Sequence, residues 1–132
     1  MKKLEELIFP IRWPFLLEKS FTTHWLKLLK EKGFYTDKIS DGSIGTKKVD
    51  CYIRTPHQDY CCEIKMVDAE LFPLTRIRPN QWKALRLYEQ NKWSSVVVVY
   101  SKKHNKYKVI PFQKIANLDK WGSVKLNFDS LE

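Results

Sequence analysis

The sequence predicts an α/β domain in which one helix precedes a β-hairpin and a second helix precedes a buried strand. Apolar residues recur at helical spacing across residues 15–32, two alternating runs flank the turn at residues 56–59, and residues 96–99 are consecutive valines. The chain has 132 residues, of which 43% are apolar. We therefore expect one domain, residues 1–132, with a single core.

Residues 1–14 are expected to form an N-terminal arm, and the core is expected to span residues 15–112. The arm begins as a short amphipathic piece and continues as an extended, proline-rich segment. Its apolar side chains, Phe9, Ile11 and Trp13, are expected to pack on the domain or on a second subunit.

Phe15 to Lys32 has the pattern of an amphipathic helix that ends at Gly33. Five apolar residues form its expected buried stripe: Leu17, Phe21, Trp25, Leu28 and Leu29. At about 100° per residue, Glu18 falls within this apolar arc. A carboxylate that faces inward needs a partner, because burying an isolated charge is costly. The alternative is an edge position from which Glu18 reaches water or a nearby lysine.

A strand at Phe34–Ile39 is followed by a turn-rich segment with two glycines, residues 40–45, and then by a hairpin with strands Val49–Thr55 and Tyr60–Val67. Because successive side chains of a strand point to opposite faces, Glu63 and Lys65 share one face. The apolar neighbours are expected on the other face: Val49, Cys51, Ile53, Cys62, Ile64 and Met66. The three charged side chains can then meet on the reverse side: Asp50, Glu63 and Lys65.

The second half of the chain begins with an expected loop at residues 69–78. Pro79 suits the first turn of a helix that extends to about Asn91, with Trp82, Leu85 and Tyr88 in its packed stripe. Gln81 in its first turn either faces the carboxylates or is an ordinary exposed glutamine. Three further elements are expected: a strand at Ser95–Ser101 covered on both faces, a strand at Lys106–Pro111, and a short helix at Phe112–Asn117. The last fifteen residues carry no clear pattern.

The chain carries 24 Lys and Arg against 15 Asp and Glu, a net charge of +9. This excess favours a polyanionic partner, most often nucleic acid, over a basic surface that only aids solubility. No apolar run approaches the roughly 20 residues of a membrane helix or has the form of a secretory signal, so we expect a cytoplasmic protein without membrane contact. The cysteines, Cys51, Cys61 and Cys62, favour reduced thiols over a zinc site with His57.

The charged residues of the hairpin suit metal-dependent attack on a phosphodiester. Asp50 and Glu63 are thirteen positions apart and offer oxygen ligands for one divalent cation, with Glu18 as a third carboxylate. Lys65 can orient or deprotonate water, or offset charge that builds on the phosphate. The pattern Asp…Glu-x-Lys alone is weak, because an exposed Glu-Ile-Lys strand is an ordinary polar face.

Four segments match a known family in order: Leu17–Phe21, Thr46–Asp50, Cys62–Lys65 and Arg76–Gln81. With them, residues 15–112 resemble the PD-(D/E)xK nuclease superfamily, and within it the RecU-like Holliday junction resolvases with their phage and archaeal relatives. The resemblance implies a restriction-endonuclease-like mixed β-sheet flanked by helices, with an α-β-β-β-α-β core. It also implies a homodimer, because a four-way junction needs two symmetric cuts.

The resemblance also assigns roles to single residues. Mg²⁺ or Mn²⁺ is expected to be bound by Glu18, Asp50, Glu63 and Ile64. Lys65 is the expected catalytic lysine, and Gln81 matches the family's polar residue in the following helix. Contacts to DNA, expected to be branched, are assigned to Thr46, Lys47, Lys48, Arg76 and Arg78.

The chain departs from the family pattern in two places. Val49 replaces the proline before the motif aspartate, and only Ser40–Lys48 stands where RecU proteins carry a long projection. The second departure leaves the preferred DNA structure open. The alternatives are a restriction- or repair-type nuclease, a non-catalytic nucleic-acid-binding module, and a basic structural protein with an acidic partner.

Overall fold

A computed structural model describes residues 3–39 and 49–128. The elements along the chain are η1 (Leu4–Glu6), α1 (Glu18–Glu31), β1 (Tyr35–Lys38), β2 (Cys51–Arg54), β3 (Asp59–Val67), β4 (Leu71–Pro73), η2 (Leu74–Arg76), α2 (Pro79–Gln90), β5 (Ser94–Ser101), β6 (Lys106–Pro111), α3 (Phe112–Ile115) and β7 (Ser123–Lys125). The expected order of helix, three strands, helix and strand is confirmed. The expected turn-rich segment at residues 40–45, together with Thr46, Lys47 and Lys48, lies outside the described residues.

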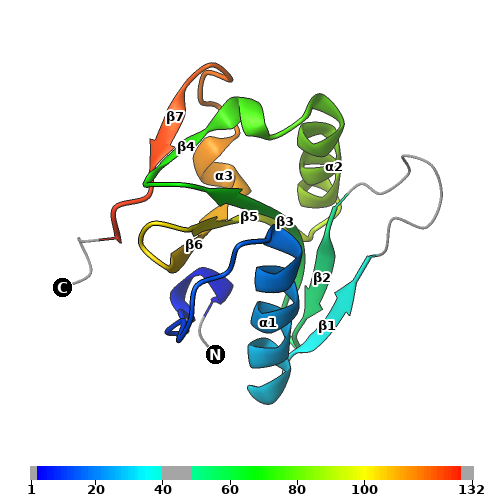
Figure 1. Cartoon of the computed structure of the whole chain (residues 1–132). Helices are drawn as coiled ribbons and strands as arrows, with labels where there is room; N and C mark the ends of the chain where they lie inside the picture. Colours follow the sequence, from blue (N-terminus) through cyan, green and yellow to red (C-terminus); the bar gives the residue numbers. More distant parts are fainter. Residues whose placement is uncertain (1–2, 40–48, 129–132) are drawn as a thin grey trace.

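The main sheet has five strands in the order β1-β2-β3-β5-β6. β3 and β5 run parallel, and every other neighbouring pair in this sheet is antiparallel. Helix α1 packs on one face, and α2 and α3 pack on the other (Figure 1). The expected mixed sheet flanked by helices is therefore confirmed.

Two apolar cores result, one on each face of the sheet. On β5, Val96 and Val98 face α1, while Val97 and Val99 face α2, and all four are almost fully buried. Burying such a side chain contributes about 1.5–3 kcal/mol relative to leaving it exposed. The prediction that this strand is covered on both faces is confirmed.

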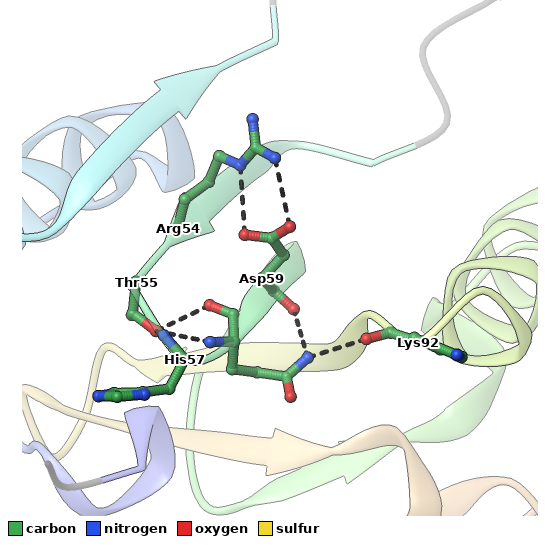
Figure 2. Close-up of polar contacts among 6 residues, drawn as sticks. Arg54, Thr55, His57, Asp59 and Lys92 are labelled. Carbon is green, nitrogen blue, oxygen red and sulfur yellow. Dashed lines mark hydrogen bonds and ion pairs between the residues drawn. The ribbon is translucent and has the colours of Figure 1, made fainter.

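The β2–β3 hairpin has a register in which Cys51 opposes Cys62 and Arg54 opposes Asp59. At the turn, Arg54 and Asp59 form an ion pair with contacts of 3.2 and 3.3 Å (Figure 2). Thr55 Oγ1 accepts hydrogen bonds from the N–H groups of His57 and Gln58, at 3.2 and 2.9 Å. These local bonds close the turn in one geometry, and hairpin register follows from turn geometry.

The turn is also tied to the segment between α2 and β5. Gln58 Nε2 donates to the carbonyl oxygens of Asp59 and Lys92, each at 3.0 Å (Figure 2). The hairpin is therefore held against the rest of the sheet at its turn end. Its other end carries Asp50, so these contacts help to set which residue of β3 lies beside that carboxylate.

The first helix begins at Glu18 rather than at Phe15, and Leu17 is 63% exposed instead of packed. Leu17 has extended dihedral angles, and the Phe15 N–H donates to the Tyr100 hydroxyl at 3.0 Å. The chain before Glu18 is thus held by β5 and cannot continue the helix. The buried residues of α1 are Phe21, Thr22, Trp25, Leu26 and Leu29, and Leu28 is only half-buried.

The N-terminal arm packs on the domain, which is one of the two alternatives that we expected; the other was packing on a second subunit. Phe9 and Ile11 lie against the α1-side core, and the Phe9 N–H donates to the Tyr107 hydroxyl at 2.9 Å. Trp13 differs, because it remains 54% exposed, with its ring 5.6 Å from that of His24.

Residues 69–78 are not a simple loop, because they contain β4 and η2. β4 pairs with β7, whose residues lie about fifty positions later in the chain. Leu126 and Phe128 are buried in the α2-side core, so the core extends beyond the expected boundary at residue 112. The three cysteines are free and buried, as expected. Within the described part of the chain, no helix is both long and apolar enough to cross a membrane.

Candidate active site

Asp50 lies immediately before β2, where the hairpin strands are still paired by main-chain contacts. Its N–H donates to the Cys62 carbonyl at 3.0 Å, and its Oδ2 accepts from the Ile64 N–H at 2.7 Å. The carboxylate is thereby held against β3 on both sides of Glu63. Val49 packs in the α2-side core and does not follow the expected alternation, because the regular strand starts only at Cys51.

Glu63 and Lys65 project from β3 toward α2, on the same face as Cys61 and Val67. This face is not the exposed polar surface of the alternative interpretation of Glu-Ile-Lys, because α2 covers it. Glu63 is 3% exposed and Lys65 8% exposed. Their charged groups form an ion pair in which Lys65 Nζ lies 3.4 Å from Glu63 Oε2.

Gln81 joins the two charges from the first turn of α2. Its Nε2 donates to Glu63 Oε2 at 2.9 Å, and its Oε1 accepts from Lys65 Nζ at 3.0 Å. The same Oε1 also accepts from the Arg78 N–H at 2.9 Å. The amide of Gln81 therefore donates to the acid and accepts from the lysine, and its oxygen is also held by the main chain at the start of α2. Gln81 is therefore not an ordinary exposed glutamine, because its side chain faces the carboxylate of Glu63.

The pKa of Glu63 is raised to about 8, and burial is the largest cause. The neighbouring Asp50 charge and a hydrogen bond to Asp50 also raise it, while Lys65 opposes the shift. Two carboxylates in one poorly solvated site resist ionising together, because like charges disfavour each other there. Without another positive charge nearby, Glu63 binds a proton below about pH 8, so its contact with Lys65 is an ion pair only in the ionised form.

The Asp50–Glu63 pair fits a divalent cation on chemical grounds. Mg²⁺ prefers oxygen ligands and is commonly bound by one or two carboxylates together with waters and substrate phosphates. Repulsion between these carboxylates, visible in the raised pKa of Glu63, is what a cation would relieve. The side chain of Ile64 lies in the α1-side core, so only its main chain could take part.

Glu18 lines a recess of about 520 Å³. We call this the Glu18 recess; its lining residues include Glu18, Val67, Asp68, Leu71, Pro73, Arg76 and Lys102. Across residues 3–39 and 49–128, no group of three His, Cys, Asp or Glu side chains is arranged to hold a metal ion. The structure therefore does not join Glu18 to the Asp50–Glu63 pair as a three-carboxylate cluster, and its role as a ligand stays a prediction.

The expected DNA contacts divide into two groups. Arg76 and Arg78 are both exposed, at the end of η2 and just before α2, so they flank the segment that leads to Gln81. Thr46, Lys47 and Lys48 lie outside the described residues.

Lys102 and Asp68 were missed as members of the site region. They line the Glu18 recess at the carboxyl ends of β5 and β3 and form an ion pair of 3.1 Å. Carboxyl ends of parallel strands are common ligand positions, but using this rule requires knowing that β3 and β5 are parallel neighbours. Another recess, of about 540 Å³ and lined by residues such as His57, Gln58 and Glu89, contains none of the predicted site residues.

No protein-family model matches the sequence, and a search of curated proteins finds no match. A search of solved structures finds Hjc, a Holliday junction resolvase of the archaeal hyperthermophile Archaeoglobus fulgidus, determined at 1.6 Å. The similarity has a TM-score of 0.64 at 13% sequence identity and covers 81% of this chain and 87% of that chain. At this identity the comparison establishes the fold: this chain has the mixed-sheet architecture of that resolvase.

Proposed function

We propose that this chain is a metal-dependent endonuclease that hydrolyses phosphodiester bonds in DNA, acts on branched DNA and works as a homodimer. The observation that carries the proposal is the buried Glu63–Lys65 pair, bridged by Gln81, with the half-buried Asp50 held beside it by the Ile64 N–H. Burying an acid and a lysine opposes folding, and a buried carboxyl group with a raised pKa, such as Glu63, is typical of functional sites. The similarity in fold to an archaeal resolvase and the net charge of +9 support the same conclusion.

In this proposal Asp50 and Glu63 hold the cation, Mg²⁺ or Mn²⁺, with the Ile64 main chain and Glu18 as further candidates. When bound, the cation supplies an activated water and offsets negative charge on the phosphate. Asp50 is oriented for this role by the Ile64 N–H, which fixes one of its carboxylate oxygens at 2.7 Å.

Lys65 is the proposed catalytic lysine: its ammonium form would orient water or offset charge on the phosphate, and its neutral amine form would deprotonate water. Gln81 is a positioning residue, because it contacts both Lys65 and Glu63 and is itself anchored by the Arg78 N–H. The DNA backbone would be held without reading of its sequence by the exposed Arg76 and Arg78, together with Lys47, Lys48 and the hydroxyl group of Thr46.

The test is cleavage of labelled four-way junction, duplex and single-stranded DNA, with Mg²⁺, with Mn²⁺ or with EDTA. We expect metal-dependent nicking that is lost in Asp50→Ala and Lys65→Ala. Asp59→Asn is the matched control, because Asp59 is an acid of the same hairpin that lies at its far end. The variant Glu63→Gln should weaken metal binding and leave DNA affinity nearly unchanged, and equal loss of both would count against a ligand role.

The outcomes separate the alternatives. Symmetric cuts confined to the junction, made by a dimer, support resolution of branched DNA. Equal cutting of linear duplex supports a restriction- or repair-type nuclease, which the short segment between β1 and β2 also permits. Tight DNA binding without cleavage under any metal supports a non-catalytic module and overturns the proposal.

A further inference from the structure

Trp121 has the highest exposed fraction, 84%, of the large apolar side chains that the structure describes. It lies between α3 and β7, a region to which the proposed nuclease chemistry assigns no role. Trp25 and Trp82, by contrast, are 0% and 8% exposed. Leu118, three positions earlier in the chain, is also 49% exposed. Large apolar side chains that the fold leaves exposed often mark a contact site.

The turn that presents Trp121 is closed by three hydrogen bonds. Asp119 Oδ1 accepts from the Trp121 N–H at 3.0 Å, and the Asp119 carbonyl accepts from the Gly122 N–H at 2.9 Å. The Gly122 carbonyl accepts from the Leu74 N–H at 3.0 Å, which attaches the turn to η2. A Cβ atom at Gly122 would lie 3.2 Å from the Asp119 carbonyl oxygen, so glycine keeps the turn this tight. The ring is therefore displayed from a preformed main chain.

The residues near Trp121 in the chain carry mainly positive charge, which favours an anionic partner. Lys114, Lys120 and Lys125 are exposed in the same segment, and Asp119, the acid of this segment, has one carboxylate oxygen occupied by the Trp121 N–H. A second copy of the chain would bring the same cations against one another across a symmetric contact. A nucleic acid instead offers phosphates to the lysines and a flat base to the indole, and every base has a face on which an aromatic ring can stack.

Intact duplex is the poorer partner for this surface, because its bases are already stacked on one another. An unpaired base, as found in single strands and at branch points, leaves such a face open. The turn also connects to the candidate active site: Gly122 bonds to Leu74, and the chain continues from there through Arg76 to Arg78 and Gln81. β4 lies beside β7 (Figure 1). Its residues Leu71 and Pro73 line the Glu18 recess.

We propose that Trp121 stacks on an unpaired nucleobase, and that the flanking lysines hold the adjoining phosphates. This inference rests on the proposed function, because the contact would give the proposed nuclease a preference for DNA with unpaired bases. The binding that it describes needs neither metal nor cleavage.

The test measures binding in EDTA to short oligothymidylate, linear duplex and a four-way junction. Trp121→Ala should weaken binding to oligothymidylate and the junction by roughly tenfold, the loss of about one stacked base, and to duplex by less than about twofold. Trp121→Phe should retain most of the affinity while removing part of the tryptophan fluorescence quenching that oligothymidylate causes. Tyr35→Ala, which removes a ring that is 63% exposed on the edge strand β1, is the matched control and should behave as wild type.

Three results would overturn the inference. They are unchanged affinity of Trp121→Ala, an equal loss on duplex, and a loss of dimer in sedimentation, which would make Trp121 a contact between copies. The proposed function is judged separately by cleavage. If the wild-type protein cuts junctions and Trp121→Ala binds DNA as tightly as wild type, only the stacking proposal is contradicted. If oligothymidylate quenches the fluorescence and Trp121→Ala binds tenfold more weakly, but no metal-dependent cleavage occurs, only the nuclease proposal is contradicted.

Discussion

The β2–β3 hairpin carries a carboxylate–cation pair at each end, and the two pairs differ in burial. At the turn, Arg54 and Asp59 approach to 3.2 Å with side chains 55% and 33% exposed. At the other end, Lys65 and Glu63 approach to 3.4 Å with side chains 10% and 4% exposed. The contact distances are nearly equal, so the environment, and not the geometry of the pair, distinguishes them.

The environment decides what each pair does. A hydrogen bond to Asp59 raises the pKa of Arg54, with no effect on its charge at any ordinary pH. Burial, by contrast, brings the pKa of Glu63 to about 8, close to physiological pH. A buried pair of this kind is weak support for stability, since desolvation offsets the attraction. The turn pair therefore belongs to the hairpin's structure, whereas the buried pair is the candidate for chemistry.

The largest expected effect is on cleavage. Lys65→Met should lower the rate of metal-dependent DNA cleavage by about 10²–10⁴-fold, the usual range for removing a group that moves or orients a proton. Arg54→Met removes the other cation of the same hairpin and should leave the rate within about twofold. Gel-based rates under single-turnover conditions provide the comparison, and similar losses in both variants would mean that the hairpin matters only as a scaffold.

The next effect is on stability against pH in metal-free protein. The folded-state pKa of Glu63, about 8, lies above its ordinary value of 4.5, so the folded state binds this proton more tightly than the unfolded state. The free energy of unfolding should therefore fall as pH rises from about 5 to 8 and level off above that. Glu63→Gln should remove this fall, which amounts to on the order of a few kcal/mol between pH 5 and pH 9.

Urea unfolding in EDTA at pH 5, 7 and 9 measures this difference. The quantity to compare is the change between pH 5 and 9 in each protein, so that contributions from other titrating groups cancel. Asp59→Asn should give a curve parallel to wild type, because Asp59 lies at the more exposed end of the hairpin. A wild-type curve parallel to that of Glu63→Gln would show that Glu63 is ionised in the folded protein well below pH 8.

A smaller effect concerns metal binding itself. Because Glu63 is protonated below about pH 8 in metal-free protein, a bound cation must displace this proton. The apparent affinity for Mg²⁺ should therefore rise by up to about tenfold per pH unit below pH 8 and become flat above it. Calorimetry in buffers of different ionisation enthalpy counts the released protons. Binding without proton release at pH 6.5 would contradict the assignment of Glu63 as a ligand.

The sequence predicted the convergence at the buried end of the hairpin for a simple reason. A strand alternates with period two, so Glu63 and Lys65 had to share a face, and the hairpin spacing brought Asp50 beside them. The cover over this face was not predicted as such, because nothing in the hairpin itself shows that α2 lies across it. For the same reason, the sequence alone left two alternatives for Gln81, which could face the carboxylates or be an ordinary exposed glutamine.

Other parts of the molecule could not be predicted because they depend on contacts distant in sequence. β4 and β7 have three residues each and pair across about fifty positions, so neither carries a periodic signal of its own. The predicted start of α1 was three residues too early. The Phe15 N–H donates to the hydroxyl group of Tyr100, and Tyr100 lies in a strand far along the chain, so this contact could not be predicted from the local pattern. Glu18 is consequently the first residue of α1, and it lines the Glu18 recess.

The smallest expected effect concerns the turn pair alone. Asp59→Asn should shift the urea midpoint only slightly, because exposed ion pairs contribute little and part of the hydrogen bonding survives in the amide. The shift should vanish in 1 M salt, where the screening length falls to about 3 Å. The pH-dependent loss attributed to Glu63 should persist in the same salt, since Glu63 is only 3% exposed. If salt removed both effects equally, burial would not be what separates the two ends of the hairpin.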